Sequence, residues 1–288
     1  MMDLFLQQLL NGLSNGSVYS LVALGLTMVF GILHVPNFAH GAFYMIGAYV
    51  SLTFMSLFGI PYWIAMLLSM LAIALLAILS ERLIYHPLRN ASGLHQMMGA
   101  IGILLFLVAF AQVIWGPNYQ QMSSPYNGAV SILGTTFTQQ RIIVIIATVI
   151  IMLLLHFFLT KTMIGSAIIA MAQSREGANL VGINANLVVM LTFAISGILA
   201  AAAATLASPI NLVFPAMGDL VIMKAFVIII IGGMGSIPGA IIAGYLLGIV
   251  ESFGATYISG DYKDIIAFAL LVTILTVKPT GLFIRRAY

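Results

Sequence analysis

The chain has 288 residues, of which 62% are hydrophobic and only 6% are charged, and its mean hydropathy is +1.15. Soluble domains are about 45–50% apolar and about 25% charged, so this composition excludes a water-soluble fold and indicates a polytopic membrane protein. The net charge of +3 comes mostly from Lys and Arg in predicted loops, and it therefore bears on orientation rather than on nucleic acid. Cysteine is absent, which excludes disulfides and thiolate metal sites.

Long apolar runs dominate the chain, and most of them can cross about 30 Å of hydrocarbon as helices. The runs are continuous rather than alternating, which favours helices over the strands of a membrane barrel. In chain order, the predicted helices cover residues 9–33, 38–58, 62–81, 95–115, 142–159, 187–207, 220–232, 238–256 and 264–283. We predict an all-α polytopic membrane protein, one transmembrane domain over residues 1–288, formed by a bundle of about 8–9 transmembrane helices with broken or re-entrant segments.

Two of these helices differ in composition. Segment 142–159 is apolar all round, which is typical of a helix that faces lipid. Segment 187–207 is rich in Ala, Ser and Gly, which favours the interior of a helix bundle.

Basic residues indicate the orientation, since Lys and Arg concentrate on the cytoplasmic side of a membrane. They lie mainly in loop 82–94, in loop 160–186 and at the C-terminus, which fall on one side if nine segments cross. Loop 116–140, on the opposite side, has no charge. We therefore expect a cytoplasmic C-terminus and an N-terminus outside. A re-entrant pair at a helix break would reduce the count to eight and leave the N-terminal side open.

The stretch "IIIIGGMGSIPGAIIAGYLLGIVES", residues 228–252, contains a glycine run that resembles a phosphate-binding loop. No Gly-Lys pair exists in the chain, and Pro238 stands where the third glycine of a dinucleotide-binding motif would fall. Each of Gly232, Gly233 and Gly235 costs about 1 kcal/mol in a helix relative to Ala. Pro238 suits the first turn of a following helix. The run therefore predicts a break between two helices rather than a nucleotide site.

Beyond the break, small residues recur every four positions at Ala240, Gly244, Gly248 and Ser252. Such a stripe allows close approach of another helix backbone. Glu251 lies seven residues after Gly244 and shares that face. A carboxylate facing lipid is costly, so Glu251 is expected to face a partner or a wet cavity. Two interpretations remain open for it: a structural, hydrogen-bonded carboxylate, or a group that lines a polar translocation path.

Two other groups place polar side chains at the membrane. Lys224 and Asp219 begin the segment before the break and need not pair; a lysine that snorkels at the membrane edge is favoured over one on the path. Asn37, His40 and Gly41 follow Pro36, where a helix begins with unpaired N–H groups that can face an anion. The alternative is a short surface turn with a capping Asn and an interfacial His. The chain has no H-E-x-x-H motif or His pair at helical spacing, so we expect no metal site.

Loop 160–186 is long for a connection in a bundle, and "SAIIAMAQSREGANL" within it is compatible with a short surface helix. It contains the pattern E-x-A-x-x-x-G at Glu176, Gly177, Ala178 and Gly182. That pattern alone is a weak signal.

Four stretches, in this order, carry a likeness to a known family: "NGLSNGSVYSLVALGLTMVFGIL", "NFAHGAFYMIGAY", "AMAQSREGANLVGIN" and "GGMGSIPGAIIAGYLLGIVES". The chain resembles the LivH-type membrane subunit of bacterial ABC importers for branched-chain amino acids. The resemblance implies a permease for branched-chain or related amino acids or amides, multi-pass in the bacterial inner (plasma) membrane. It gives Glu176, Gly177, Ala178 and Gly182 a role in coupling to an ATPase. It gives Asn37, His40, Gly41, Lys224 and Glu251 a looser role near the translocation path.

The resemblance also implies partners. These are a second related permease of the LivM type, two cytoplasmic ATPases that hold ATP and Mg, and a periplasmic or extracellular binding protein, besides membrane lipid. No cofactor and no nucleic acid is expected on this chain, and it is not expected to be an enzyme. Pro36 and Gly232–Gly235 are candidate hinges, and loop 116–140 is a candidate docking surface. Unlike many members, the chain has no Arg shortly after Gly165. A stand-alone channel or an ion-coupled secondary transporter is the alternative.

Overall fold

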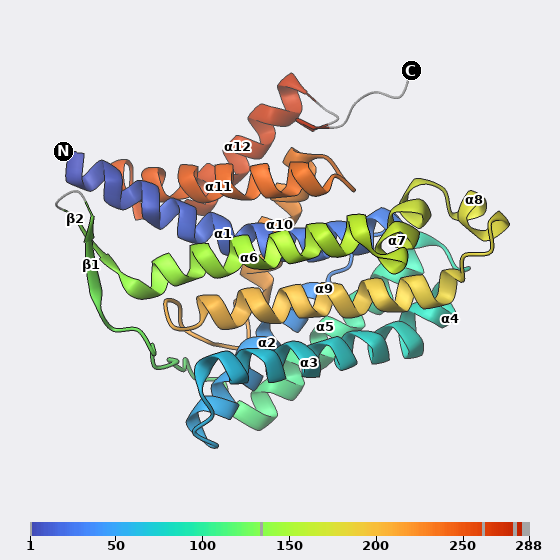
Figure 1. Cartoon of the computed structure of the whole chain (residues 1–288), viewed down its shortest axis with the longest axis horizontal. Coiled ribbons are helices and arrows are strands. Elements are labelled where there is room, and N and C mark those ends of the chain that lie inside the picture. Colours follow the sequence, from blue (N-terminus) through green and yellow to red (C-terminus); the bar gives the residue numbers. More distant parts are fainter. Residues whose placement is uncertain (1, 133–134, 261–262, 279–280, 284–288) are drawn as a thin grey trace.

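A computed structural model describes residues 2–132, 135–260, 263–278 and 281–283. Helices dominate, and most of them lie side by side along one long axis (Figure 1). The main helices are α1 (Met2–Leu33), α2 (Ala39–Ser56), α3 (Tyr62–Ser80), α5 (Gly93–Trp115), α6 (Gln139–Lys161), α9 (Ala185–Ala207), α10 (Met217–Gly232), α11 (Ile237–Tyr257) and α12 (Lys263–Val277). Shorter elements are the π-helix η1 (Glu81–Tyr85), α4 (His86–Leu88), α7 (Met163–Gln173), α8 (Arg175–Leu180) and the strands β1 (Ala129–Ile132) and β2 (Thr135–Thr138).

Each predicted apolar segment coincides with one of the main helices, which confirms the all-α membrane class. Within the described residues, six helices are long and apolar enough to cross a membrane: α1, α3 with its extension to Leu88, α5, α6, α9 and α11. The sequence analysis placed the start of the first helix too late, because α1 already begins at Met2. It also missed the antiparallel hairpin β1–β2 in the uncharged loop, which pairs Val130 with Phe137. Two of the basic residues on which the predicted orientation of the C-terminus depends, Arg285 and Arg286, lie outside the described residues.

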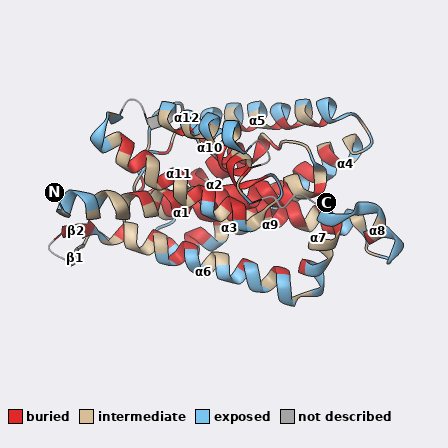
Figure 2. Cartoon of the chain, turned by 90° about the horizontal axis from the view of Figure 1, so that it is seen from above, coloured by how far each residue is buried: buried red, intermediate tan, exposed pale blue. Residues whose placement is uncertain are grey.

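The core lies where α1, α2, α9, α10 and α11 meet (Figure 2). In contrast, α5 and α6 expose long apolar faces, as lipid-facing helices do. The prediction that segment 142–159 faces outward and segment 187–207 faces inward is confirmed: 28% of the α6 span is buried against 72% of the α9 span.

The two halves of the chain repeat each other with opposite direction. Helix α1 packs along α11 in the way that α9 packs along α3, and α10 packs on α1 in the way that α2 packs on α9. Likewise, α5 covers α2 and α12 covers α10. Along the chain, the single helix α6 connects the two sets. Because α6 crosses the bundle once, the second set begins at the end of the bundle opposite to the one where the first set begins (Figure 1). The result is an inverted-topology repeat, an arrangement that many transporters share.

Both α2 and α10 begin in the middle of the bundle. Nε2 of His40, in the first turn of α2, donates to the backbone oxygen of Val22, and its Nδ1 is hydrogen-bonded to the Ser196 hydroxyl; Val22 lies well before the end of α1. A Cβ on Gly25 would lie 2.7 Å from Cε1 of His40, and Gly25 is eight residues before the end of α1, or about 12 Å at 1.5 Å per residue. In turn, a Cβ on Gly41 would lie 2.5 Å from the backbone oxygen of Gly218, in the first turn of α10.

The small-residue stripe on α11 packs against α1, as predicted. A Cβ on Gly248 would lie 2.5 Å from Cα of Gly16, and a Cβ on Gly244 would lie 2.9 Å from Cα of Ser20. A Cβ on Gly12 would lie 2.7 Å from Cα of Ile249. The sequence analysis missed this second stripe, Gly12, Gly16 and Ser20, which has the same four-residue spacing on α1 and lets the two backbones touch.

The glycine run is a break between two helices, which confirms the prediction. Helix α10 ends at Gly232, and Gly233 and Gly235 adopt φ values of 96° and 84°, which favour glycine. The Ser236 side chain then accepts a hydrogen bond from the N–H of Gly239, and Pro238 lies in the first turn of α11. The break therefore reverses the chain at one end of the bundle without leaving the new helix uncapped.

Candidate functional site

A buried ion pair joins α10 to α11. Nζ of Lys224 lies 2.9 Å from Oε1 of Glu251 and donates to its Oε2 at 2.9 Å. The hydroxyl of Tyr19, on α1, donates to Oε2 of Glu251 at 2.8 Å and accepts from Nζ of Lys224 at 3.0 Å. The favoured interpretation of Lys224 as a snorkelling lysine is therefore wrong. Its ammonium turns inward because a buried carboxylate is stabilised by a cation at contact distance.

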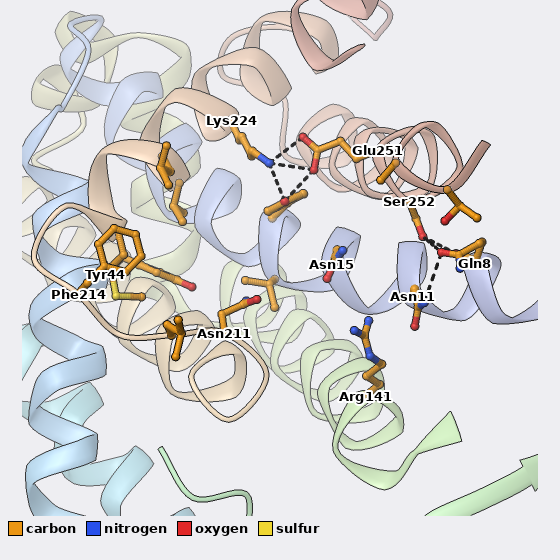
Figure 3. Close-up of a pocket in the computed structure, with 18 residues that line it drawn as sticks. Gln8, Asn11, Asn15, Tyr44, Arg141, Asn211, Phe214, Lys224, Glu251 and Ser252 are labelled. Carbon is orange, nitrogen blue, oxygen red and sulfur yellow. Dashed lines mark hydrogen bonds and ion pairs between the residues drawn. The ribbon is translucent and has the colours of Figure 1, made fainter. Parts of the chain in front are cut away.

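The pair lies on the wall of a cavity of about 450 Å³ between α1, α6, α10, α11 and the non-helical segment 208–216 (Figure 3). Along α1, the side chains of Gln8, Asn11, Asn15 and Tyr19 line it. Their spacing of three or four residues places them on one face of the helix. Both interpretations of Glu251 therefore hold in part, since it is hydrogen-bonded and buried and it also lines a polar cavity.

The sequence analysis missed the polar residues that α1 contributes to the cavity, and it also missed Arg141 and Asn211. Arg141, in the first turn of α6, reaches toward the α1 amides, and Asn211 enters from segment 208–216 (Figure 3). Nη1 of Arg141 is buried and has no hydrogen-bond partner among the described residues. The available signal was a charged residue within an otherwise apolar helix, which by default marks a functional site.

The predicted group at the start of α2 is buried rather than at the surface. The side chain of Asn37 accepts from the N–H of Ala39, the first residue of α2, at 3.1 Å and from the Tyr85 hydroxyl at 2.6 Å, while the N-cap position itself is Phe38. His40 is fully buried between Val22 O and the Ser196 hydroxyl, each 3.0 Å from a ring nitrogen. The alternative of a surface turn with an interfacial His is therefore wrong.

His40 and Asn37 do not line the cavity, unlike Lys224 and Glu251. Gly41 is at the contact between α2 and α10, and its role is close packing against Gly218. Pro36 lies in the non-helical segment 34–38 that precedes α2. The predicted path residues therefore separate into a cavity group and a buried structural group.

Loop 160–186 forms two short helices, α7 and α8, where one surface helix was predicted. The Ser174 hydroxyl caps α8 by accepting from the N–H of Gly177 at 3.1 Å. Glu176 is exposed and Ala178 is buried, so the motif presents its carboxylate outward and anchors the helix by its methyl group. Gly182, at φ 84°, ends the turn.

Several basic side chains lie at the end of the bundle that holds α7 and α8. Arg175 at the start of α8 lines a small cavity with Glu81, His86 and Arg89, and the Arg89 guanidinium donates to the Asn186 side chain. Glu81 is buried and lies 3.6 Å from Nδ1 of His86. The short helices α7 and α8 both pack on α9, and α7 also packs on α6 and α1.

A bundle of apolar helices with inverted halves, broken helices and a polar cavity defines a membrane transport protein. Comparison with known families assigns it more narrowly: residues 8–275 match the model of the branched-chain amino acid transport system permease component. The chain belongs to this family.

Individual relatives cover almost the whole chain. It is 37% identical to the high-affinity branched-chain amino acid transport system permease protein BraD of Pseudomonas aeruginosa and to LivH of Escherichia coli, in each case over 98% of this chain and 96% of the relative. A probable branched-chain amino acid transport permease protein LivH of Methanocaldococcus jannaschii is 29% identical over 91% of this chain and 87% of its own.

The fold has a counterpart among solved structures. A chain of PsaBC from Streptococcus pneumoniae, solved in complex with Fab, matches 97% of this chain and 94% of its own length, with a TM-score of 0.52 and 14% identity. At that identity the likeness concerns the fold alone.

Proposed function

We propose that this chain is the membrane-spanning permease subunit of an ABC importer that moves branched-chain amino acids, or related amino acids and amides, across the bacterial inner membrane. The observation that carries this proposal is the match of residues 8–275 to the permease family. ATP hydrolysis takes place on partner subunits, and this chain converts it into a change of access. No residue of this chain is assigned to that hydrolysis.

We propose that the end of the bundle with α4, α7 and α8 faces the cytoplasm, together with the C-terminus. Support comes from the basic residues at this end, including Arg89 and Arg175. The opposite end holds the N-terminus and the hairpin β1–β2 (Figure 1), and with loop 116–140 it forms the docking surface for the extracytoplasmic binding protein. All the main helices then lie within the membrane, nine in number, with α2 and α10 starting at its middle.

The segment 160–186 acts as the coupling loop of the single permease domain. Glu176, Gly177, Ala178 and Gly182 couple this loop to the ATPase: the exposed Glu176 contacts it, and the buried Ala178 holds α8 in place. A second, LivM-type permease completes the membrane assembly with two ATPases. The exposure of the Glu176 carboxylate on α8 supports this role. Pro36 and Gly232–Gly235 remain the candidate hinges, because non-helical backbone at both places tolerates rearrangement.

Liposomes test the proposal. The chain alone should not accumulate leucine, whereas the chain assembled with the permease, ATPases and binding protein of its own host should do so when ATP is supplied. Leucine transport by the chain alone, in the absence of ATP, would instead identify a channel, which equilibrates the solute, or an ion-coupled carrier, which accumulates it. A valid comparison requires equal amounts of inserted chain, measured by an epitope on the N-terminus.

A further inference from the structure

We propose that the cavity between α1, α6, α10 and α11 is the outward entrance of the translocation path, and that Arg141 receives the carboxylate of the transported amino acid there. This inference rests on the proposed function for the identity of the solute. It assigns a binding site and a recognition residue in the permease chain itself.

The length and volume of the cavity suit the entry of a small molecule. The lining residues Gln8 and Tyr19 are eleven positions apart on α1, which corresponds to about 16 Å along the helix axis. The Tyr19–Lys224–Glu251 cluster lies on its wall. Met217, which also lines the cavity, is next in sequence to Gly218, and Gly218 makes the contact with Gly41. A volume of about 450 Å³ is within the range of sites for small molecules.

The charges of the cavity favour an anionic group. Its Lys, Arg, Asp and Glu lining residues are Arg141, Lys224 and Glu251. Lys224 and Glu251 offset each other at 2.9 Å, whereas no ion pair joins Arg141 to a described residue. Arg141 therefore supplies an excess positive charge, and its planar guanidinium fits a carboxylate with two parallel hydrogen bonds.

The rest of the lining suits an aliphatic amino acid. Asn15 and Asn211 bring amide groups into the same cavity as Arg141, and the described structure gives their side chains no hydrogen-bond partner (Figure 3). Val18, Leu220 and Val221 add apolar surface on the same cavity. Amide donors can complete the coordination of a carboxylate while the apolar residues contact its hydrocarbon side chain.

Cysteine labelling tests the site directly, because the chain has no native cysteine. Ala255 lines the cavity near its outer end and is not one of the proposed ligands. In the assembled transporter, Ala255→Cys should react faster with an anionic methanethiosulfonate (sulfonatoethyl) than with a cationic one (trimethylammonioethyl). After normalisation to Tyr119→Cys, an exposed site outside the cavity, we expect a preference of about tenfold.

Arg141→Gln should reduce this preference to about one, and Arg141→Lys should keep most of it. Arg82→Gln is the matched control, since Arg82 is exposed at the other end of the bundle, and it should leave the preference unchanged. L-leucine, but not L-leucinol, which lacks the carboxylate, should slow the labelling of Ala255→Cys. A missing anion preference, a preference that survives Arg141→Gln, or equal protection by leucinol would overturn the inference.

Leucine uptake, measured on the same membranes, separates this inference from the proposed function. If the transporter with Arg141 in place takes up no leucine but shows the anion preference, the result counts against the proposed function and supports the anionic site. Intact uptake without any anion preference counts against Arg141 and supports the proposed function.

Discussion

Gly41 and Gly218 meet at the centre of the bundle, where a Cβ on Gly41 would lie 2.5 Å from the backbone oxygen of Gly218. The two residues are in the first turns of α2 and α10, which run toward opposite ends. Their contact is therefore one of the places where the two inverted halves of the chain touch, and it joins the equivalent helices α2 and α10.

Gly218→Val should destabilise the protein, because the new side chain has no space at this contact. Overpacking of this kind typically costs about 1–3 kcal/mol, and we expect a clear fall in the melting temperature of the detergent-solubilised transporter. Gly102→Val is the matched control, since a Cβ on Gly102 meets no atom within 4 Å. Equal melting temperatures for the two variants would show that the α2–α10 contact is loose.

Removal of one charge of the Lys224–Glu251 pair should destabilise the protein much more than replacement of both charges. Lys224→Met leaves a buried carboxylate without its cation, which costs about 3–5 kcal/mol. The double variant Lys224→Met with Glu251→Leu should recover most of the lost stability, because both charges then disappear. Thermal melting of the single and double variants measures this recovery; a double variant as unstable as the sum of the two single ones would argue against direct pairing.

Gly235→Val should weaken the turn between α10 and α11 through its backbone rather than through crowding. Gly235 has φ 84°, while the nearest atom to an added Cβ is Cα of Gly31 at 3.9 Å. A left-handed conformation costs a non-glycine residue about 1–2 kcal/mol. Melting temperatures should fall in the order Gly, Asn, Val, because Asn tolerates this conformation better. Identical values for Asn and Val would contradict a backbone origin.

Glu176→Lys should uncouple ATP hydrolysis from uptake. The exposed carboxylate is proposed to contact the ATPase, and reversal of its charge should weaken that contact by at least about 1.4 kcal/mol, or tenfold. Uptake should fall in the reconstituted transporter, while the amount of inserted chain stays the same. Asn90→Lys, an exposed position at the same end of the bundle, is the control and should retain uptake. Normal uptake by Glu176→Lys would remove the coupling role.

The sequence was sufficient for features that depend on neighbouring residues. Hydrophobic runs located the main helices, and Gly233, Gly235 and Pro238 located the break, because backbone preference is local. The four-residue stripe with Gly244 and Gly248 predicted close packing for the same reason. Val130 and Phe137, with the threonines near them, also carry a strand signal that was overlooked.

Contacts between segments that are distant in the sequence could not be predicted in this way. Lys224 and Glu251 are 27 residues apart and meet only because α10 and α11 fold back on each other next to Tyr19. A run of apolar residues also does not indicate how deep in the membrane it lies. The sequence analysis therefore left two positions open for His40 and the start of α2, one at the surface and one in the interior. The inverted repeat was missed because it relates packing partners and not residue types.

The central crossing has an electrical consequence. Segments 34–38 and 208–216, which precede α2 and α10, bring non-helical backbone toward it, so a layer of packed protein separates the two sides here. A membrane potential performs work on a net charge that crosses such a layer, about 2.3 kcal/mol per unit charge at 100 mV. A zwitterion has no net charge, and its passage through this barrier is therefore independent of voltage, whereas a cationic or anionic amino acid would be driven or opposed by it.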